Sequence, residues 1–175
     1  PHSDEWHDFR GYAGKIISGR FEKGHKVQVL PSGFETRVKD MRLYKDLVDE
    51  ACTPASVIMQ LEDDIDAGRG DMIARVDNLP KVSQQFDAMV CWMSEDVMLP
   101  RKKYLLKHGS NEVTAMITKK VYTLDVNTFS KANDQTLQIG LNDIARISIK
   151  TSKPLNFDPF ESNRANGSFI LIDSQ

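Results

Sequence analysis

Residues Asp8 to Gly33 read DFRGYAGKIISGRFEKGHKVQVLPSG, and this stretch decides the fold of the chain. Glycines mark a loop at its start, and the alternation of apolar and polar side chains around Val27 and Val29 predicts a strand. Lys23-Gly24 and Pro31-Ser32-Gly33 carry the residue types of tight turns, because glycine tolerates positive φ and proline has a fixed φ. The stretch therefore predicts a loop followed by two strands and two tight turns.

The same two-residue alternation continues along the chain, whereas helical periodicity is scarce. Apolar side chains occupy every second position in seven stretches: Val27–Val29, Val57–Leu61, Met72–Val76, Phe86–Val90, Val113–Ile117, Ile147–Ile149 and Phe169–Leu171. Turn residues recur about every 8 to 12 positions, a spacing typical of sandwiches and barrels. Between Leu43 and Glu50 we expect an extended strand and a loop, not a helix. The pattern predicts an all-β fold.

Asp77-Asn78-Leu79-Pro80 marks the predicted domain boundary. The residues up to Leu79 contain 11 basic and 15 acidic side chains, and the remainder contain 12 and 10. The alternation restarts at Phe86, beyond the proline. We therefore predict two tandem small antiparallel β-barrels, residues 1–79 and 80–175, because closure removes exposed strand edges. The net charge of −2 argues against nucleic acid as a partner.

Residue patterns that carry chemistry are missing from the sequence. No stretch matches Gly-x-x-x-x-Gly-Lys-Ser/Thr, the loop whose backbone N–H groups surround the phosphates of GTP or ATP. The histidines show no metal-ligand spacing, and the acidic run Glu62–Asp66 fails the calcium-loop frame, so we interpret it as a solvated turn. Cys52 and Cys91 are expected to be reduced, half-buried thiols. We predict no catalytic residue, no metal site and no cofactor site in this chain.

Two further patterns have competing interpretations. Asn166-Gly167-Ser168 would accept a glycan only in a secreted protein, so we interpret it as a turn. A basic cluster surrounds the predicted strand Tyr104–Leu106 and consists of Arg101, Lys102, Lys103 and Lys107. This cluster could bind an acidic partner surface or phosphate. It could also be a solvated strand edge on which lysines discourage pairing, and that is the simpler interpretation.

Several segments, in one consistent order, carry a resemblance to a known family. The most specific are LLKHG at Leu105–Gly109 and NDIAR at Asn142–Arg146. The others are the opening stretch, Leu61–Ile73, Phe86–Met93, Val113–Ile117, Lys153–Leu155 and Asn163–Asp173. Together they resemble the large, GTPase subunit of bacterial sulfate adenylyltransferase, also called ATP sulfurylase subunit 1. That subunit is related to translation elongation factors, and the likeness covers nearly the whole chain.

The resemblance implies a specific role. In this family a P-loop GTPase domain, which uses GTP and Mg²⁺, precedes two β-barrels related to elongation-factor domains 2 and 3. A small catalytic subunit joins sulfate to ATP, giving adenosine 5′-phosphosulfate and pyrophosphate, and GTP hydrolysis drives this step of sulfate assimilation. The chain would be the accessory barrel pair of a cytoplasmic enzyme with no membrane partner. The family also has a strand before Pro1 and another after Gln175, so we expect both to be missing.

The resemblance also suggests one contact site, the loop formed by Phe9, Arg10, Gly11 and Tyr12. In the related elongation factors the equivalent loop lies near the switch regions of the GTPase domain. The competing explanation is that Gly11 and Gly14 only permit positive φ. Two other functions stay open. One is a tRNA- or RNA-binding barrel pair of a translation elongation factor, and the other is a free-standing interaction module.

Overall fold

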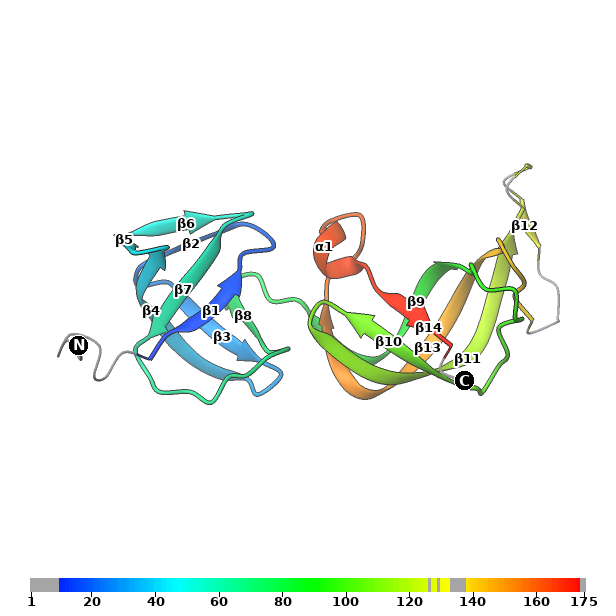
Figure 1. The fold of residues 1–175 in the computed structure, drawn as a ribbon, viewed down its shortest axis with the longest axis horizontal. Coiled ribbons are helices and arrows are strands. Elements are labelled where there is room, and N and C mark those ends of the chain that lie inside the picture. Colours follow the sequence, from blue (N-terminus) through cyan, green and yellow to red (C-terminus); the bar gives the residue numbers. More distant parts are fainter. Residues whose placement is uncertain (1–9, 126, 129, 133–137, 174–175) are drawn as a thin grey trace. The chain divides into compact units, whose positions relative to one another are not determined.

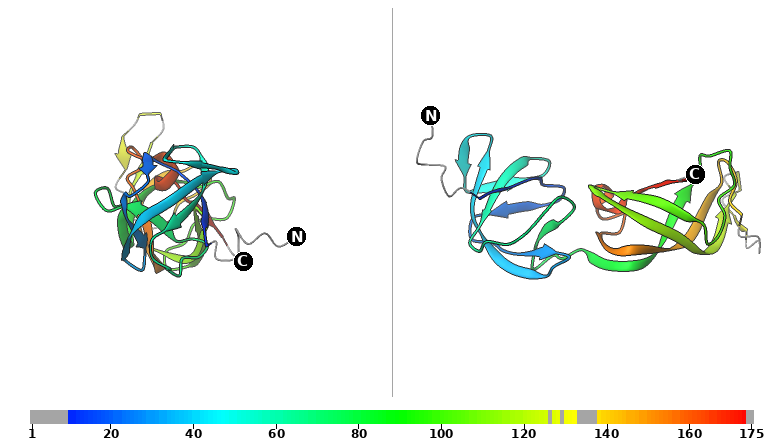
Figure 2. Two further views of the ribbon diagram at one scale, coloured as in Figure 1. Left: turned by 90° about the vertical axis from the view of Figure 1, so that its left-hand side faces the viewer. Right: turned by 60° about the horizontal axis from the view of Figure 1, so that its bottom comes forward.

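The computed structural model describes residues 10–125, 127–128, 130–132 and 138–173. The chain divides into two compact units. The first runs up to Lys81 and includes Asn156–Ser168, and the second comprises Val82–Leu155 and the residues from Phe169 onward. The strands of each unit curve around the core of that unit (Figures 1 and 2). The domain boundary between residues 79 and 80 stays a prediction.

The first unit is built on the opening stretch of the sequence. Its main antiparallel sheet has the order β1-β7-β4-β3-β8, and β5 pairs with β4. The bounds are β1 (Tyr12–Lys15), β3 (Lys26–Leu30), β4 (Phe34–Leu43), β5 (Asp46–Val48), β7 (Ser56–Leu61) and β8 (Met72–Arg75). A second, two-stranded sheet pairs β2 (Arg20–Glu22) with β6 (Glu50–Cys52). Between Leu43 and Glu50 the described chain is not helical, as predicted, but a tight turn comes first and the strand β5 follows it, where a strand followed by a loop was expected.

The core of the first unit follows the predicted alternation. Val27 and Val29 of β3 are fully buried, and their neighbours Lys26 and Gln28 face away from the core. Val57, Met59 and Leu61 of β7 are buried in the same cluster. The predicted turns are confirmed, since Gly24 and Gly33 have φ of 83° and 82°. This left-handed region costs other residues about 1–2 kcal/mol, which explains glycine at both positions.

The second unit holds one larger antiparallel sheet. Its strand order is β14-β10-β11-β13-β9, and β12 pairs with β11 (Figure 1). The bounds are β9 (Lys81–Cys91), β10 (Lys103–His108), β11 (Asn111–Leu124), β12 (Lys131–Ala132), β13 (Ile144–Phe157) and β14 (Ile170–Ile172). Tyr104 and Leu106 are buried from β10, and Ile147 and Ile149 from β13. The predicted strand Tyr104–Leu106 is thus confirmed as part of β10.

A compact turn between β13 and β14 contains α1 (Arg164–Gly167). The carboxylate of Asp158 accepts hydrogen bonds from the side-chain amides of Asn163 at 2.8 Å and Asn166 at 3.0 Å. The backbone N–H of Asn166 donates to Asn163 Oδ1 at 3.3 Å, so Asn163 caps the turn. Asn166-Gly167-Ser168 therefore lies in a turn, as predicted, with Asn166 buried.

The predicted fold class is confirmed: both units are small antiparallel β-barrels in an all-β chain. One expectation about side chains is wrong. Cys52 and Cys91 are both exposed, not half-buried. Each lies at the end of a strand next to a buried residue, Ala51 for Cys52 and Trp92 for Cys91. Because successive side chains of a strand point to opposite sides, each cysteine faces solvent. Within the residues that the structure describes, no helix has the length and apolar character that a membrane span requires.

A carboxylate on β9 links two strands of the second unit and makes stability depend on pH. Asp87 accepts hydrogen bonds from the hydroxyl of Ser148 at 2.7 Å and from the guanidinium of Arg146 at 3.2 Å. The Ser148 bond is the main cause that lowers the pKa of Asp87 below its usual value, and Arg146 adds to it. The native state therefore binds this proton less readily than the unfolded chain does.

We expect Asp87→Asn to reduce the loss of stability in acid. The contribution of Asp87 is fully present above the unfolded pKa of about 4 and is lost as the pH falls through the lowered native pKa. Because the side chain is partly exposed, the difference should be about 0.5 kcal/mol or less. Urea unfolding at pH 7 and at pH 3 measures this loss of stability in the wild type and in Asp87→Asn. Ser148→Ala is a second variant, which weakens the same interaction. Equal acid sensitivity in wild type and Asp87→Asn would contradict the assignment.

Candidate functional site

The first strand and the acidic loop of the first unit form one surface. The guanidinium of Arg10 makes an ion pair with Asp64, and both side chains are more than half exposed. The hydroxyl of Tyr12 donates to the backbone carbonyl of Ile65 and accepts the Ile65 N–H at 3.2 Å. Two of the predicted contact residues are therefore joined to a loop more than 50 positions away.

A buried hydroxyl holds the same acidic loop from the other side. Thr36 of β4 donates to the Asp63 carboxylate at 2.8 Å and accepts the Asp63 N–H at 3.3 Å. The Ile65 side chain is 7% exposed and belongs to the core cluster. The solvated turn predicted for Glu62–Asp66 is thus held through Asp63, Asp64 and Ile65, while all four of its acidic residues stay exposed. The loop presents its carboxylates in a defined arrangement beside Arg10.

The outcome for the predicted contact loop differs among its members. Phe9 lies outside the described residues, and Gly11 is exposed between Arg10 and Tyr12. The competing explanation, that glycine is needed to permit a positive φ, is wrong for Gly14. This residue lies in β1, and its φ is not in the left-handed region. An added Cβ at Gly14 would meet no atom within 4 Å, so neither backbone conformation nor packing inside the unit requires glycine there.

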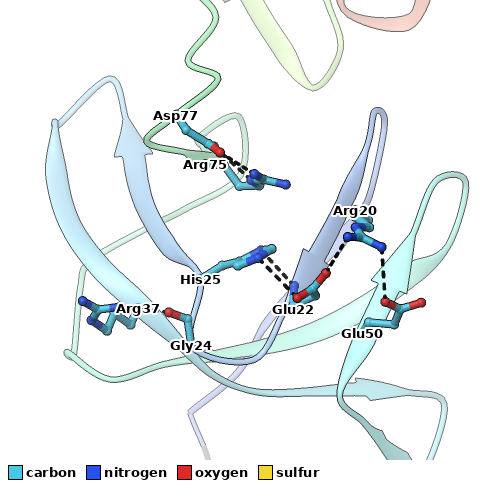
Figure 3. A network of polar contacts seen from close by, with 8 residues as sticks. All are labelled: Arg20, Glu22, Gly24, His25, Arg37, Glu50, Arg75 and Asp77. Atoms are coloured by element: carbon cyan, nitrogen blue, oxygen red, sulfur yellow. Dashed lines mark hydrogen bonds and ion pairs between the residues drawn. The ribbon is translucent and has the colours of Figure 1, made fainter.

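A polar network beside β2, shown in Figure 3, was not predicted from the sequence. Arg20 lies 3.1 Å from the carboxylate of Glu22 and 3.8 Å from that of Glu50. The Glu22 N–H donates to His25 Nδ1 at 3.1 Å, and His25 Nε2 lies 3.6 Å from the Glu22 carboxylate. Arg20 thus connects a carboxylate of β2 with one of β6, so the network supports the pairing of these two strands.

A second ion pair in Figure 3 lies at the end of β8. Arg75 Nε donates to Asp77 at 2.9 Å, and a second guanidinium nitrogen contacts the other carboxylate oxygen. This bidentate pairing lowers the pKa of the Asp77 carboxyl and raises the pKa of Arg75. Both groups therefore keep their charges at neutral pH, as expected of a structural ion pair.

The structure separates the members of the predicted basic cluster in the second unit. Lys102 pairs with Asp173 at 2.6 Å, and Lys107 pairs with Glu112 at 2.8 Å. Arg101 lies in the turn before β10 with φ of 61°, and its N–H donates to the Ile117 carbonyl. Lys103 is exposed on β10. Two of the four cations are thus neutralised within the chain, which leaves Lys103 and Arg101 as the exposed charges.

The surfaces described above differ in the charges that they expose. Among the residues that the structure describes, no three His, Cys, Asp or Glu side chains lie close enough together to hold a metal ion. The surfaces offer exposed carboxylates beside Arg10 in one unit and exposed lysines in the other. Such surfaces can bind another protein domain through charge and apolar contact.

Comparisons with known proteins identify the relatives of the chain. A model of the GTP-eEF1A C-terminal domain-like family matches residues 85–175. The chain is 44% identical over 174 residues to the bifunctional enzyme CysN/CysC of Mycobacterium tuberculosis, covering 99% of this chain and 28% of that protein. It is 43% identical to sulfate adenylyltransferase subunit 1 of Bacteroides fragilis, covering 95% of this chain and 34% of the relative. The chain thus spans about a third or less of the length of these relatives.

Solved structures show the same fold at low sequence identity. Sup35 complexed with GDP matches with a TM-score of 0.83 and 18% identity, over 94% of this chain and 43% of that one. Translation elongation factor SelB from Methanococcus maripaludis matches with a TM-score of 0.66 and 20% identity, over 83% of this chain and 32% of that one. The resemblance stated from the sequence is therefore confirmed: the chain belongs to the GTP-eEF1A C-terminal domain-like family and is a homologue of part of sulfate adenylyltransferase subunit 1.

Proposed function

We propose that this chain is the accessory barrel pair of the GTP-hydrolysing subunit of a sulfate adenylyltransferase. In that role it transmits the nucleotide state of a GTPase domain of the same protein, which uses GTP and Mg²⁺, to a small catalytic subunit. That subunit forms adenosine 5′-phosphosulfate from ATP and sulfate in the cytoplasm. The observation that carries the proposal is identity above 40% along 95% of the chain to two proteins named sulfate adenylyltransferase subunit 1.

Within this role we assign Arg10 and Tyr12, with the neighbouring Gly11, to the contact with the GTPase domain. Three features support the assignment: Arg10 and Gly11 are exposed, Asp64 orients Arg10, and Tyr12 is fixed through Ile65. A surface that reports a conformational change must itself be held in place, and these contacts hold it. The basic residues Arg101 and Lys103 form a second candidate contact, because they are the two exposed charges of the basic cluster that have no ion pair within the described residues.

Replacement of Arg10 by alanine in the full-length subunit tests the assignment. We expect the rate of GTP hydrolysis to change at least threefold, while the free energy of unfolding changes by about 0.5 kcal/mol or less, because an exposed ion pair stabilises little. Asp64→Ala is the matched control, because it breaks the same ion pair and leaves the guanidinium available. An unchanged hydrolysis rate in Arg10→Ala, or equal changes in both variants, would remove the assignment.

The proposed function has its own test. The full-length subunit, mixed with the small subunit, should form adenosine 5′-phosphosulfate faster when GTP is present than when it is absent. The alternative, an RNA-binding barrel pair, predicts instead that tRNA binds with a steep salt dependence. The translation-factor structures are compatible with both, since at 18–20% identity they show the fold alone. Salt-sensitive tRNA binding without GTP stimulation would overturn the proposal.

A further inference from the structure

The sequence contains the dipeptide Asn-Gly once, at Asn166-Gly167, and the structure places it in α1, inside the turn between β13 and β14 (Figure 1). The backbone nitrogen that follows an asparagine can attack the side-chain amide. A bond then forms between Gly167 N and Asn166 Cγ, the Cγ–Nδ2 bond breaks, and ammonia leaves with the proton of the Gly167 N–H. Water opens the resulting cyclic imide to aspartate or isoaspartate. Glycine hinders this attack least, because it has no Cβ.

In the folded turn the attacking nitrogen is already engaged. The Gly167 N–H donates to the Asn163 carbonyl at 2.8 Å, which is the hydrogen bond of the helical turn. An added Cβ at Gly167 would overlap the Phe160 backbone, so these two segments are in direct contact. Attack on Asn166 requires the Gly167 peptide to rotate away from the Asn163 carbonyl, and the contact with Phe160 restricts that rotation. The fold therefore withholds the nucleophile.

The amide that would be attacked is held as well. Asn166 is 3% exposed, and its Nδ2 donates to the Asp158 carboxylate at 3.0 Å. The same carboxylate oxygen accepts the side-chain amide of Asn163 at 2.8 Å. Burial keeps out the water that would carry a proton from Gly167 to the leaving nitrogen. Both reaction partners become available only when the turn opens, because the same contacts define the turn and block the reaction.

We propose that Asn166 is a deamidation site that the folded turn protects, and that its conversion to aspartate prevents the opened turn from closing again. The product places a carboxylate where the amide donated to Asp158, at the 3.0 Å separation of that hydrogen bond. Two ionised carboxylates at this distance repel one another, and neither can donate a hydrogen bond. Isoaspartate also lengthens the backbone by one atom. This inference concerns the turn alone and does not depend on the proposed function.

Mass spectrometry measures the protection directly. The purified protein is incubated at mildly alkaline pH, either folded or unfolded in urea, and digested with trypsin. The peptide that begins at Ala165 contains no asparagine other than Asn166 up to Gln175. We expect deamidation to be at least about tenfold slower in the folded protein, because a reaction of the open form follows the population of that form. Equal rates in both states, or no deamidation in either, would overturn the proposal.

Asn163→Ala tests whether the contacts of this turn give the protection. The variant removes the cap of α1 and one hydrogen bond to Asp158, so deamidation of the folded protein should become at least about threefold faster. Ser162→Ala is the matched control, because it removes a neighbouring side-chain hydrogen bond, 2.9 Å to the Pro159 carbonyl, that does not involve Asn166. Circular dichroism and Trp92 fluorescence verify that both variants are folded. The same rate in Asn163→Ala as in Ser162→Ala would overturn the assignment of the protection to these contacts.

Asn166→Asp reproduces the direct product of the reaction. Amide exchange of residues 156–168 should be at least about tenfold faster in this variant than in the wild type, because the turn stays open for a larger fraction of the time. Asn78→Asp is the matched control, with the same change of charge at an exposed asparagine. Wild-type exchange in Asn166→Asp would overturn the second half of the proposal, since the turn then closes around the new carboxylate.

Discussion

Gly167→Ala is expected to destabilise the turn between β13 and β14 by about 3 kcal/mol, the upper part of the range for inserting a methyl group into a packed site. A Cβ at Gly167 would lie 2.5 Å from Phe160 Cα, 2.7 Å from Phe160 N and 3.0 Å from the Asp158 carbonyl. All three are backbone atoms, so no side-chain rotation can relieve the contact. The turn must open instead, and the Asp158 N–H then loses its 3.4 Å hydrogen bond to the Asn166 carbonyl.

Urea unfolding and amide exchange of residues 156–168 measure this effect. Gly68→Ala is the matched control, because Gly68 also lies in a loop, has no positive φ, and would place its Cβ more than 4 Å from other atoms. The control should change stability by about 0.5 kcal/mol or less, as expected for a surface substitution. Similar losses in both variants would show that the cost does not arise from the contact with Phe160, because replacing an unstrained glycine by alanine should not destabilise the fold.

Local patterns predicted the strands because strand burial has a period of two. Alternation alone assigned two pairs of residues each to one side of their own strand, and the structure buries all four. They are Val27 and Val29 of β3 and Val57 and Met59 of β7. The pattern fails where a β-bulge interrupts it. Register shifts near Ile117 and again after Lys120 place the Lys120 side chain on the buried side, where its ammonium donates to the Gln138 carbonyl. Alternation carries no information about where a bulge occurs.

The candidate sites were less predictable because they depend on long-range pairing. Arg10 and Tyr12 were predicted as a contact loop, but their fixed geometry comes from Ile65, which strand order brings next to them. Lys103 was predicted within a local basic cluster, whereas its partner on the next strand is Met116, and Lys150 lies one strand further on. Such neighbours follow from register, and register is set by turns and bulges along the whole chain.

Ile65→Ala tests whether one apolar side chain holds the acidic loop in place. Ile65 stands alone among the carboxylates of Glu62–Asp66, and its side chain lies in the core cluster with Val38 and Leu61. Truncation of a buried isoleucine removes apolar contacts and leaves a cavity, so we expect a loss of about 3 kcal/mol. The hydrogen bonds between Tyr12 and the Ile65 backbone should weaken as well, because the loop is no longer held against the core.

The result is measured by urea unfolding and by hydrogen exchange of the loop between β7 and β8. Ile17→Ala is the matched control, since the same truncation at a side chain that is 37% exposed should cost about 1 kcal/mol or less. Faster exchange confined to this loop in Ile65→Ala is the expected signature. The alternative result is that the loop keeps the hydrogen-exchange protection of the wild type while the free energy of unfolding falls. That result would show that the hydrogen bonds of Thr36 and Tyr12 are enough to hold the loop, and that Ile65 contributes only to the packing of the first unit. Under the proposed function, a loosened loop should also alter GTP hydrolysis in the full-length subunit, but by less than Arg10→Ala does, because it disturbs the orientation of a guanidinium that Arg10→Ala removes.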